Sequence, residues 1–399
     1  MRIGINCLDL NPEYVGGVNT YLFGLLDAFA KNKEHSFSVF TLKKNSFLFK
    51  KYSKCSNIEQ VIIKRNKVTI LFKRIIKRAA LYSNSIILYK YVNDLLFKNE
   101  ANLIQKNIDI LYFPTVALTY FSYHVSTVVS MHDIQQVHFP FFFSKHELFF
   151  RRITYNLTAN YSNYIQASSD YSKSDFLNYF KNLKESQMVV IPEGVNIEAF
   201  SEIKDRELLK KYSVPEKYIF YPAQLWKHKN HLTLLKAILK LKTQGTEIAL
   251  VLTGGKMSAG NEIFKFIEEN GLKNNVHYLG KVPFEVLVAL YQHAMIVVVP
   301  SLHESSSLPI LEAAAARVPI IASDIPSIRE MNNRLKLFLF EPYDYEKLSN
   351  LILSFWKENP EKKAQIEHNT QNILTYTWQN AAEHYLIFFK KVLSDTKPN

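Results

Sequence analysis

Two kinds of residue are scarce in this sequence, which has 2 cysteines and 11 glycines among 399 residues. Cys7 and Cys55 stand far apart, so they give neither a disulfide framework nor a zinc pattern and predict a reducing, cytoplasmic compartment. No apolar run approaches the roughly 18 residues of a membrane-spanning helix. The G-x-G-x-x-G fingerprint is also missing, which disfavours a dinucleotide-dependent oxidoreductase, a rival class that also uses two Rossmann-like domains.

Positive charge is what the sequence has in excess, with a formal net charge of +13. Residues 1–195 hold 24 Lys and Arg against 14 Asp and Glu, whereas residues 196–399 hold 25 against 22. The segment 43–106 alone has 15 basic and 3 acidic residues. A stretch of this kind can attract nucleic acid, anionic lipid or an acidic substrate.

Short apolar runs alternate with helical patterns along the whole chain, which indicates parallel sheets with helices on both faces. We predict an α/β protein with two doubly wound, Rossmann-like domains that face each other across a cleft. In the first half the strand candidates are residues 3–8, 37–42, 110–113, 127–130, 164–167 and 189–191. In the second half they are residues 218–221, 248–252, 276–279, 295–299, 319–322 and 337–340.

The predicted domains cover residues 1–200 and 201–375, and the polar segment 196–215 is expected to connect them. The helical pattern at 376–395 is expected to pack back on the first domain. The first six residues predict a strand and not a signal peptide.

The segment from 295 to 317 predicts a strand, a loop and a helix in succession. Residues 295–299 form an unbroken apolar run, and Pro309 suits the first turn of a helix. Ser305, Ser306 and Ser307 are candidate caps of that helix. Its free N-terminus would favour a phosphate, because unpaired N–H groups and a positive partial charge gather there.

Two carboxylates, Glu304 and Glu312, flank this predicted phosphate site. They could bind the hydroxyls of a sugar and a ribose. The plainer interpretation, a capped helix with an acidic first turn, has about even weight on the pattern alone.

The spacing of these glutamates resembles the retaining GT-B glycosyltransferases, in particular family 4. The resemblance covers nearly the whole chain and rests on several motifs in order. They are Gly16-Gly17-Val18, His132-Asp133, Ser168-Ser169-Asp170, Pro192-Glu193-Gly194, Trp226-Lys227-His228-Lys229-Asn230-His231, Gly280-Lys281-Val282-Pro283, Glu304 with Glu312, and Ser323-Asp324-Ile325-Pro326.

The resemblance implies a role for each matching position. Glu304 would contact the donor sugar, Glu312 the nucleoside ribose, and Lys229 the diphosphate. His132 would lie beside the donor sugar, although a lone histidine at a strand end is more often structural. The implied catalytic residues are His132, Lys229 and Glu304, and the implied donor-binding residues are Gly17, Gln224, Lys229, Ser306, Ser307, Leu308 and Glu312.

Two departures from the family pattern concern the diphosphate. Gln224 stands where the family usually has an arginine, and Ser306-Ser307 stands where it usually has Phe-Gly. They keep open the alternative of an inactive family member that acts as a membrane or complex partner.

The reaction implied by the resemblance is transfer of a sugar, with retention, from a nucleotide-diphosphate donor to a glycan or lipid-linked acceptor. The expected setting is bacterial surface polysaccharide synthesis, such as O-antigen, capsule or exopolysaccharide. The resemblance implies a hexosyltransferase. The sequence has no Asp-x-Asp motif and no clustered metal ligands, so we expect this enzyme to need neither a metal nor another cofactor.

The basic residues of the first half gather between positions 64 and 78, where seven Lys and Arg stand without an acid. Lys73, Arg74, Lys77 and Arg78 alternate with apolar residues, which suits an amphipathic helix on an anionic membrane surface. A solvated surface helix is the equally weighted alternative. Nucleic acid is not an expected partner, because no nucleic-acid module accompanies the charge. We expect a cytoplasmic protein that can sit peripherally on the plasma membrane.

Overall fold

The computed structural model describes residues 1–12, 16–65, 75–76, 82, 85–116, 118, 120–357 and 359–395. It divides the chain into two compact units. Unit 1 comprises Met1–Pro192 and Ala381–Asn399, and unit 2 comprises Glu193–Asn380.

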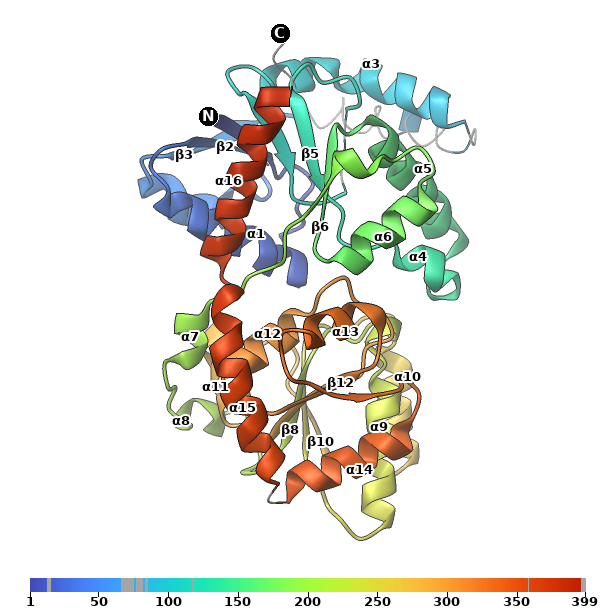
Figure 1. The fold of residues 1–399 in the computed structure, drawn as a ribbon. Coiled ribbons are helices and arrows are strands. Elements are labelled where there is room, and N and C mark those ends of the chain that lie inside the picture. The colour runs from blue at the N-terminus through green and yellow to red at the C-terminus, as the bar shows by residue number, and fades with distance from the viewer. Residues whose placement is uncertain are drawn as a thin grey trace. The chain divides into compact units, whose positions relative to one another are not determined.

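Unit 1 is built on a seven-stranded parallel sheet in the order β3-β2-β1-β4-β5-β6-β7 (Figure 1). Its strands are β1 (Arg2–Asn6), β2 (Ser36–Leu42), β3 (Ile58–Ile63), β4 (Ile110–Phe113), β5 (Ser126–Ser130), β6 (Tyr164–Ala167) and β7 (Met188–Val190). The α-helices described between them are α1 (Gly17–Lys31), α3 (Ile86–Ile104), α4 (Gln135–His138), α5 (Lys145–Tyr161) and α6 (Asp170–Tyr179). Strand β4 is buried at every position, as expected where helices cover both faces of a sheet.

Unit 2 repeats the scheme with six parallel strands in the order β10-β9-β8-β11-β12-β13. The strands are β8 (Ile219–Pro222), β9 (Leu250–Thr253), β10 (Val276–Tyr278), β11 (Ile296–Val299), β12 (Ile320–Ser323) and β13 (Phe338–Phe340). The helices are α7 (Ile197–Ser201), α8 (Glu207–Lys210), α9 (His231–Thr243), α10 (Gly260–Glu269), α11 (Phe284–Gln292), α12 (Leu308–Ala315), α13 (Pro326–Asn332), α14 (Tyr345–Trp356) and α15 (Pro360–Asn372).

The last helix, α16 (Trp378–Asp395), belongs to unit 1 from Ala381 onward, although unit 1 otherwise ends at Pro192. A buried group of hydroxyls fixes it there. The Tyr385 hydroxyl forms hydrogen bonds with the hydroxyls of Tyr21, Tyr112 and Ser130. The hydroxyl oxygens of Tyr112 and Ser130 are also hydrogen-bonded to each other, at 2.7 Å. Since all four side chains are fully enclosed, each hydroxyl needs these partners to avoid an unpaired polar group in the core.

The segment 196–215 is not a mere connection between domains. It forms α7 and α8 inside unit 2, which begins at Glu193 and not near residue 200. Phe200 and Leu209 are each only 2% exposed, so the burial of these side chains stabilises the packing of the segment in unit 2.

The two parallel-sheet, Rossmann-like domains predicted from the alternation of apolar and helical patterns are confirmed. In each sheet the strand order reverses once, between β1 and β4 in unit 1 and between β8 and β11 in unit 2. Such reversals open a crevice at the carboxyl ends of the strands, where doubly wound proteins bind their ligands.

Candidate donor site

The predicted donor residues of unit 2 lie in the loops that leave the carboxyl ends of β8 and β11. The loop after β8 carries Gln224 and Lys229, and the loop after β11 carries Glu304 and Ser306. The site therefore stands at the strand-order reversal of this sheet.

Asn230 anchors the first of these loops to the second. It adopts a left-handed conformation, with φ 55° and ψ 38°, which asparagine tolerates better than most residues. Its side-chain amide donates to the carbonyls of Pro300 at 2.9 Å and Pro342 at 2.6 Å. The Tyr221 hydroxyl donates to the carbonyl of Lys229 at 2.9 Å. These bonds hold the backbone of Lys229 in place above the sheet edge.

Lys229 and Glu304 form an ion pair across the two loops, with Nζ 2.6 Å from Oε1. Their side chains are only 18% and 10% exposed, so water screens the pair less than it screens a surface pair. An ammonium group has three donors, and Glu304 occupies one of them. The pair can therefore place a cation beside a phosphate and a carboxylate beside sugar hydroxyls at the same time.

Helix α12 begins beside this pair and leaves its first N–H groups open. In the described structure, no hydrogen bond is donated by the backbone N–H of Ser307 or Leu308. Ser307 is the N-cap residue, but its hydroxyl does not cap the helix, which corrects the expectation from the sequence. Pro309 occupies the second helical position and has no N–H to donate, so one of the two usual partners of a capping hydroxyl is missing.

The hydroxyl of Ser307 is consequently unused. Ser307 is completely buried, and its Oγ has no hydrogen-bond partner in the described residues. A buried polar group without a partner costs free energy, and native proteins keep few of them. Together with the open N–H groups, this hydroxyl suits an anionic oxygen at the helix N-terminus.

Glu312 lies further along α12 in a different environment. Burial raises its pKa from 4.5 to about 7, and a hydrogen bond from the Tyr291 hydroxyl at 2.6 Å partly opposes that rise. No cation pairs with it in the described structure, so its carboxylate can exchange a proton near neutral pH.

Gln224, which replaces the arginine usual in the family, is engaged with its neighbour Trp226. Its side-chain oxygen accepts from the indole N–H at 3.2 Å, and its carbonyl accepts from the Trp226 backbone at 2.7 Å. The turn therefore orients Trp226, and Gln224 brings no charge to the site.

His132 stands at the carboxyl end of β5 in unit 1. Its Nε2 lies 2.9 Å from the carbonyl of Pro114, so Nε2 carries the proton and Nδ1 is the acceptor. Burial lowers its pKa, against smaller opposing effects of the carbonyl and of Asp133, which keeps the ring neutral at pH 7. The edge of the Tyr21 ring packs against it, with centroids 5.0 Å apart. Because Nδ1 of this neutral imidazole has no hydrogen-bond partner in the described part of the chain, it can accept a hydrogen bond from a ligand hydroxyl.

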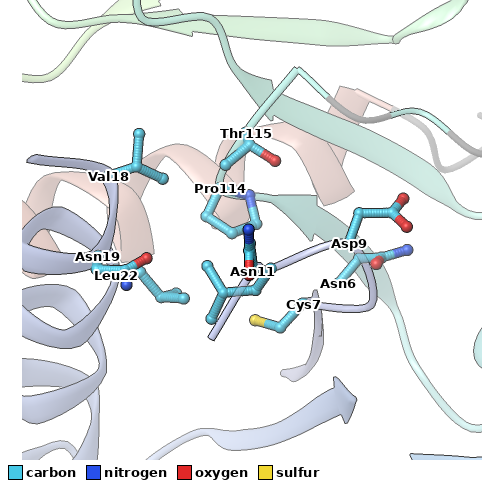
Figure 2. A pocket seen from close by; sticks show the side chains of 10 residues that line it. Asn6, Cys7, Asp9, Asn11, Val18, Asn19, Leu22, Pro114 and Thr115 are labelled. Atoms are coloured by element: carbon cyan, nitrogen blue, oxygen red, sulfur yellow. The ribbon is translucent and has the colours of Figure 1, made fainter. Parts of the chain in front are cut away.

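A pocket occupies the strand-order reversal of the first sheet (Figure 2). In Figure 2, Val18 and Leu22 of α1 form one wall, while Asn6 at the end of β1 and Asp9 of the following loop lie on another side. Asn6 is 7% exposed, and its Nδ2 has no partner in the described structure. The lining residues are Asn6, Cys7, Asp9, Leu10, Asn11, Val18, Asn19, Leu22, Pro114 and Thr115. This mixture of amides with an apolar wall suits an uncharged, hydroxylated ligand.

Gly17 and the basic residues of the predicted membrane surface are the remaining expected groups. Gly17 opens α1 as an exposed residue, next to Val18 of the pocket. Lys73, Arg74, Lys77 and Arg78 lie outside the described residues. In the described ranges, no group of three or more His, Cys, Asp and Glu could hold a metal ion, and no helix is long and apolar enough to cross a bilayer.

Sequence reasoning assigned no role to Tyr291, Tyr221 or Asn230, which hold the site residues in place. The role of Asn230 could have been predicted, because it belongs to the motif at 226–231 and asparagine is frequent in left-handed positions. Tyr291 gives no such signal, because it meets Glu312 only through the packing of α11 on α12.

Two parallel, doubly wound domains with candidate ligand residues at their strand reversals define a GT-B fold, and comparisons with known proteins support that class. The model of glycosyl transferases group 1 matches residues 204–373, and the model of glycosyltransferase family 4 matches residues 15–199. The chain therefore belongs to glycosyltransferase family 4, as its motifs predict.

Curated relatives and solved structures agree with this assignment. The chain is 24% identical to an O-antigen chain mannosyltransferase B of Escherichia coli, over 66% of this chain and 70% of that protein. It is 26% identical to the O-antigen chain mannosyltransferase RfbU of Salmonella typhimurium, over 51% of this chain and 53% of that protein. The structure of Anabaena HepE with UDP and glucose matches with a TM-score of 0.72 at 18% identity, over 98% of this chain and 99% of that one.

Proposed function

We propose that this chain transfers a sugar from a nucleoside-diphosphate donor to a glycan or lipid-linked acceptor in surface polysaccharide assembly. One observation carries the proposal: the Lys229–Glu304 ion pair lies in the loops beside an uncapped helix N-terminus. Cation, carboxylate and open N–H groups are what a sugar diphosphate requires. The O-antigen mannosyltransferases and the UDP-binding Anabaena protein among the similar proteins support the same donor and product classes.

The chemistry follows from where charge develops. Glycosyl transfer passes through an oxocarbenium-like state while negative charge grows on the leaving diphosphate. Lys229 and the N-terminus of α12 would stabilise that charge without a metal ion, and Glu304 would orient the sugar hydroxyls. We assign no covalent nucleophile, and retention belongs to the proposal because the family resemblance implies it.

For the acceptor, we propose the pocket of unit 1. Asn6, Asp9 and Asn11 offer donors and acceptors for hydroxyl groups, and Leu22 offers an apolar surface for a sugar ring. His132 would accept the hydrogen bond of a sugar hydroxyl through Nδ1.

A screen of nucleotide sugars with polyprenyl-linked and free glycan acceptors tests the function. We expect one donor to turn over in the presence of a metal chelator, with an anomerically retained product. Glu304→Ala and Lys229→Ala variants that turn over like the parent would contradict the site. If the chain is instead an inactive family member that acts as a membrane or complex partner, no donor should be hydrolysed or transferred.

Peripheral contact with an anionic membrane is a separate part of the proposal. Helix α3 exposes Ile87, Tyr91 and Leu95, at 79%, 68% and 67%, and their spacing of four places them on one helical face. The basic stretch of the sequence precedes this helix. We expect the parent to pellet with vesicles containing phosphatidylglycerol and the triple serine variant of this face to pellet less, whereas Ile203→Ser in unit 2 should bind like the parent. No binding of the parent at moderate salt would exclude membrane contact.

A further inference from the structure

Tyr291 belongs to α11 and is fixed before any ligand arrives. Its ring is fully buried and meets Phe200 of α7 and Phe220 of β8 edge-on, with centroids 5.4 Å and 5.0 Å apart. Edge-to-face packing on two sides leaves the ring one orientation. Its hydroxyl is therefore a rigid donor.

That donor is aimed at one oxygen of Glu312. The hydroxyl lies 2.6 Å from Oε2, while Oε1 has no hydrogen-bond partner in the described structure. The pKa of Tyr291 is raised well above 10 by its burial and by Glu312, so the phenol keeps its proton at every pH of interest. One carboxylate oxygen is held and the other is free for a ligand.

We infer that Tyr291 is a positioning residue for donor binding, which fixes Glu312 so that its free oxygen accepts the hydroxyls of the nucleoside ribose. The inference rests on the proposed function, in which Glu312 contacts the ribose. A carboxylate poorly exposed to water makes strong hydrogen bonds to hydroxyls, provided that its orientation is set in advance.

Among the described residues, no charged group of the elements packed against α12 has an ion pair with Glu312. The elements packed against α12 are α7, α11, α15, the turn at Ile373–Thr375, β11 and β12. Their titratable or charged side chains are Glu198, Glu285, Tyr291, Glu361, Lys362, Lys363, Glu367 and His368. Within the described residues, only Tyr291 has a hydrogen bond or ion pair with Glu312. Loss of the phenol would therefore act on Glu312 directly.

The test compares a nucleoside diphosphate with its 2′,3′-dideoxy analogue by calorimetry across a range of pH. In Tyr291→Phe we expect the affinity for the ribonucleotide to fall about three- to tenfold, as for loss of one hydrogen bond. The dideoxy analogue should be hardly affected, and kcat should stay within about twofold. Because the lost bond favours the ionised carboxylate, the pH below which ribonucleotide affinity declines should move upward.

Tyr218→Phe is the matched control. Its buried hydroxyl also bonds α11, at the carbonyl of Leu290 at 2.8 Å, but does not touch Glu312. It should leave both the ribose preference and the pH profile unchanged. In a Glu312→Gln background, Tyr291→Phe should no longer alter the ribose preference.

The outcomes separate two kinds of failure. Equal ribose preference and an equal pH profile in Tyr291→Phe and the parent would overturn the positioning role, as would equal losses for both ligands. Failure of the parent to bind any nucleoside diphosphate would instead overturn the proposed function, and this inference with it.

Discussion

Glu304 and Glu312 stand on either side of the start of α12, but their surroundings differ. Glu304 lies in a loop and bonds a cation, Lys229, at 2.6 Å. Glu312 lies within the helix and bonds a neutral phenol, Tyr291, at the same distance. The partner of Glu304 is a charged group, whereas burial raises the pKa of Glu312 to about 7 and its neutral partner only partly opposes that rise. The two glutamates should therefore respond differently to substitution, and a response to pH near 7 is expected from Glu312.

The largest difference should appear in turnover. We expect Lys229→Ala and Glu304→Ala each to lower kcat/KM by about 100-fold or more, since they remove stabilisation of the leaving group and the sugar. Steady-state kinetics with the cognate donor measure the effect. Lys240→Ala, which breaks the more exposed ion pair with Glu346 on the same unit, should remain within about twofold of the parent.

Glu312→Gln should act on donor binding instead. We expect the KM for the donor to rise about tenfold above pH 7, with kcat little changed, because an amide accepts hydroxyl protons less strongly than a carboxylate. The parent should lose donor affinity as the pH falls through about 7, and the variant should not. A variant that keeps the parent's pH profile would show that another group titrates.

Substitution of each glutamate by glutamine should change the free energy of unfolding with opposite signs. Folded Glu312 keeps its proton up to about pH 7, whereas an ordinary glutamate loses it near 4.5. The free energy of unfolding therefore falls as the pH rises through this window. At about pH 8, Glu312→Gln should be more stable than the parent by about 1–3 kcal/mol, and this gain should vanish near pH 4.5.

Glu304→Gln should instead be less stable than the parent, by about 1–2 kcal/mol, because it leaves the Lys229 ammonium unpaired. Denaturant unfolding of both variants at two pH values measures the contrast. If both substitutions changed the free energy of unfolding in the same direction, the two glutamates would share one kind of environment.

The smallest effect should come from Ser307, between the two glutamates. Ser307→Ala should weaken nucleoside-diphosphate binding about three- to tenfold if its unpaired hydroxyl donates to a phosphate. The unliganded protein should lose no stability, because it loses no hydrogen bond. Ser327 of α13 is also buried with an unpaired hydroxyl, so Ser327→Ala is a control that should bind like the parent.

The sequence predicted most strands of both sheets and the strand–loop–helix unit that carries Glu304, because these follow from apolar periodicity and local motifs. It missed β3 (Ile58–Ile63), whose strand carries the polar residues Glu59 and Gln60 and is followed by the basic run. Periodicity identifies such a mixed edge strand poorly.

What could not be predicted is long-range pairing. The positions of Lys229 and Glu304 were predicted, but not their ion pair, which joins residues 75 apart. Tyr291 and Glu312 are brought together by packing alone. The lack of a hydrogen-bond partner for the Ser307 hydroxyl in the described residues depends on the helix geometry around Pro309. Contacts of this kind exist only once the sheet has assembled the loops.

Calorimetric titration of UDP, GDP and dTDP tests the central claim most directly, with a chelator present and with Lys229→Ala alongside the parent. We expect one diphosphate to bind the parent with a dissociation constant between about 1 μM and 1 mM, and to bind the variant at least about tenfold more weakly. Absence of binding to the parent, or equal binding to both proteins, would contradict that claim.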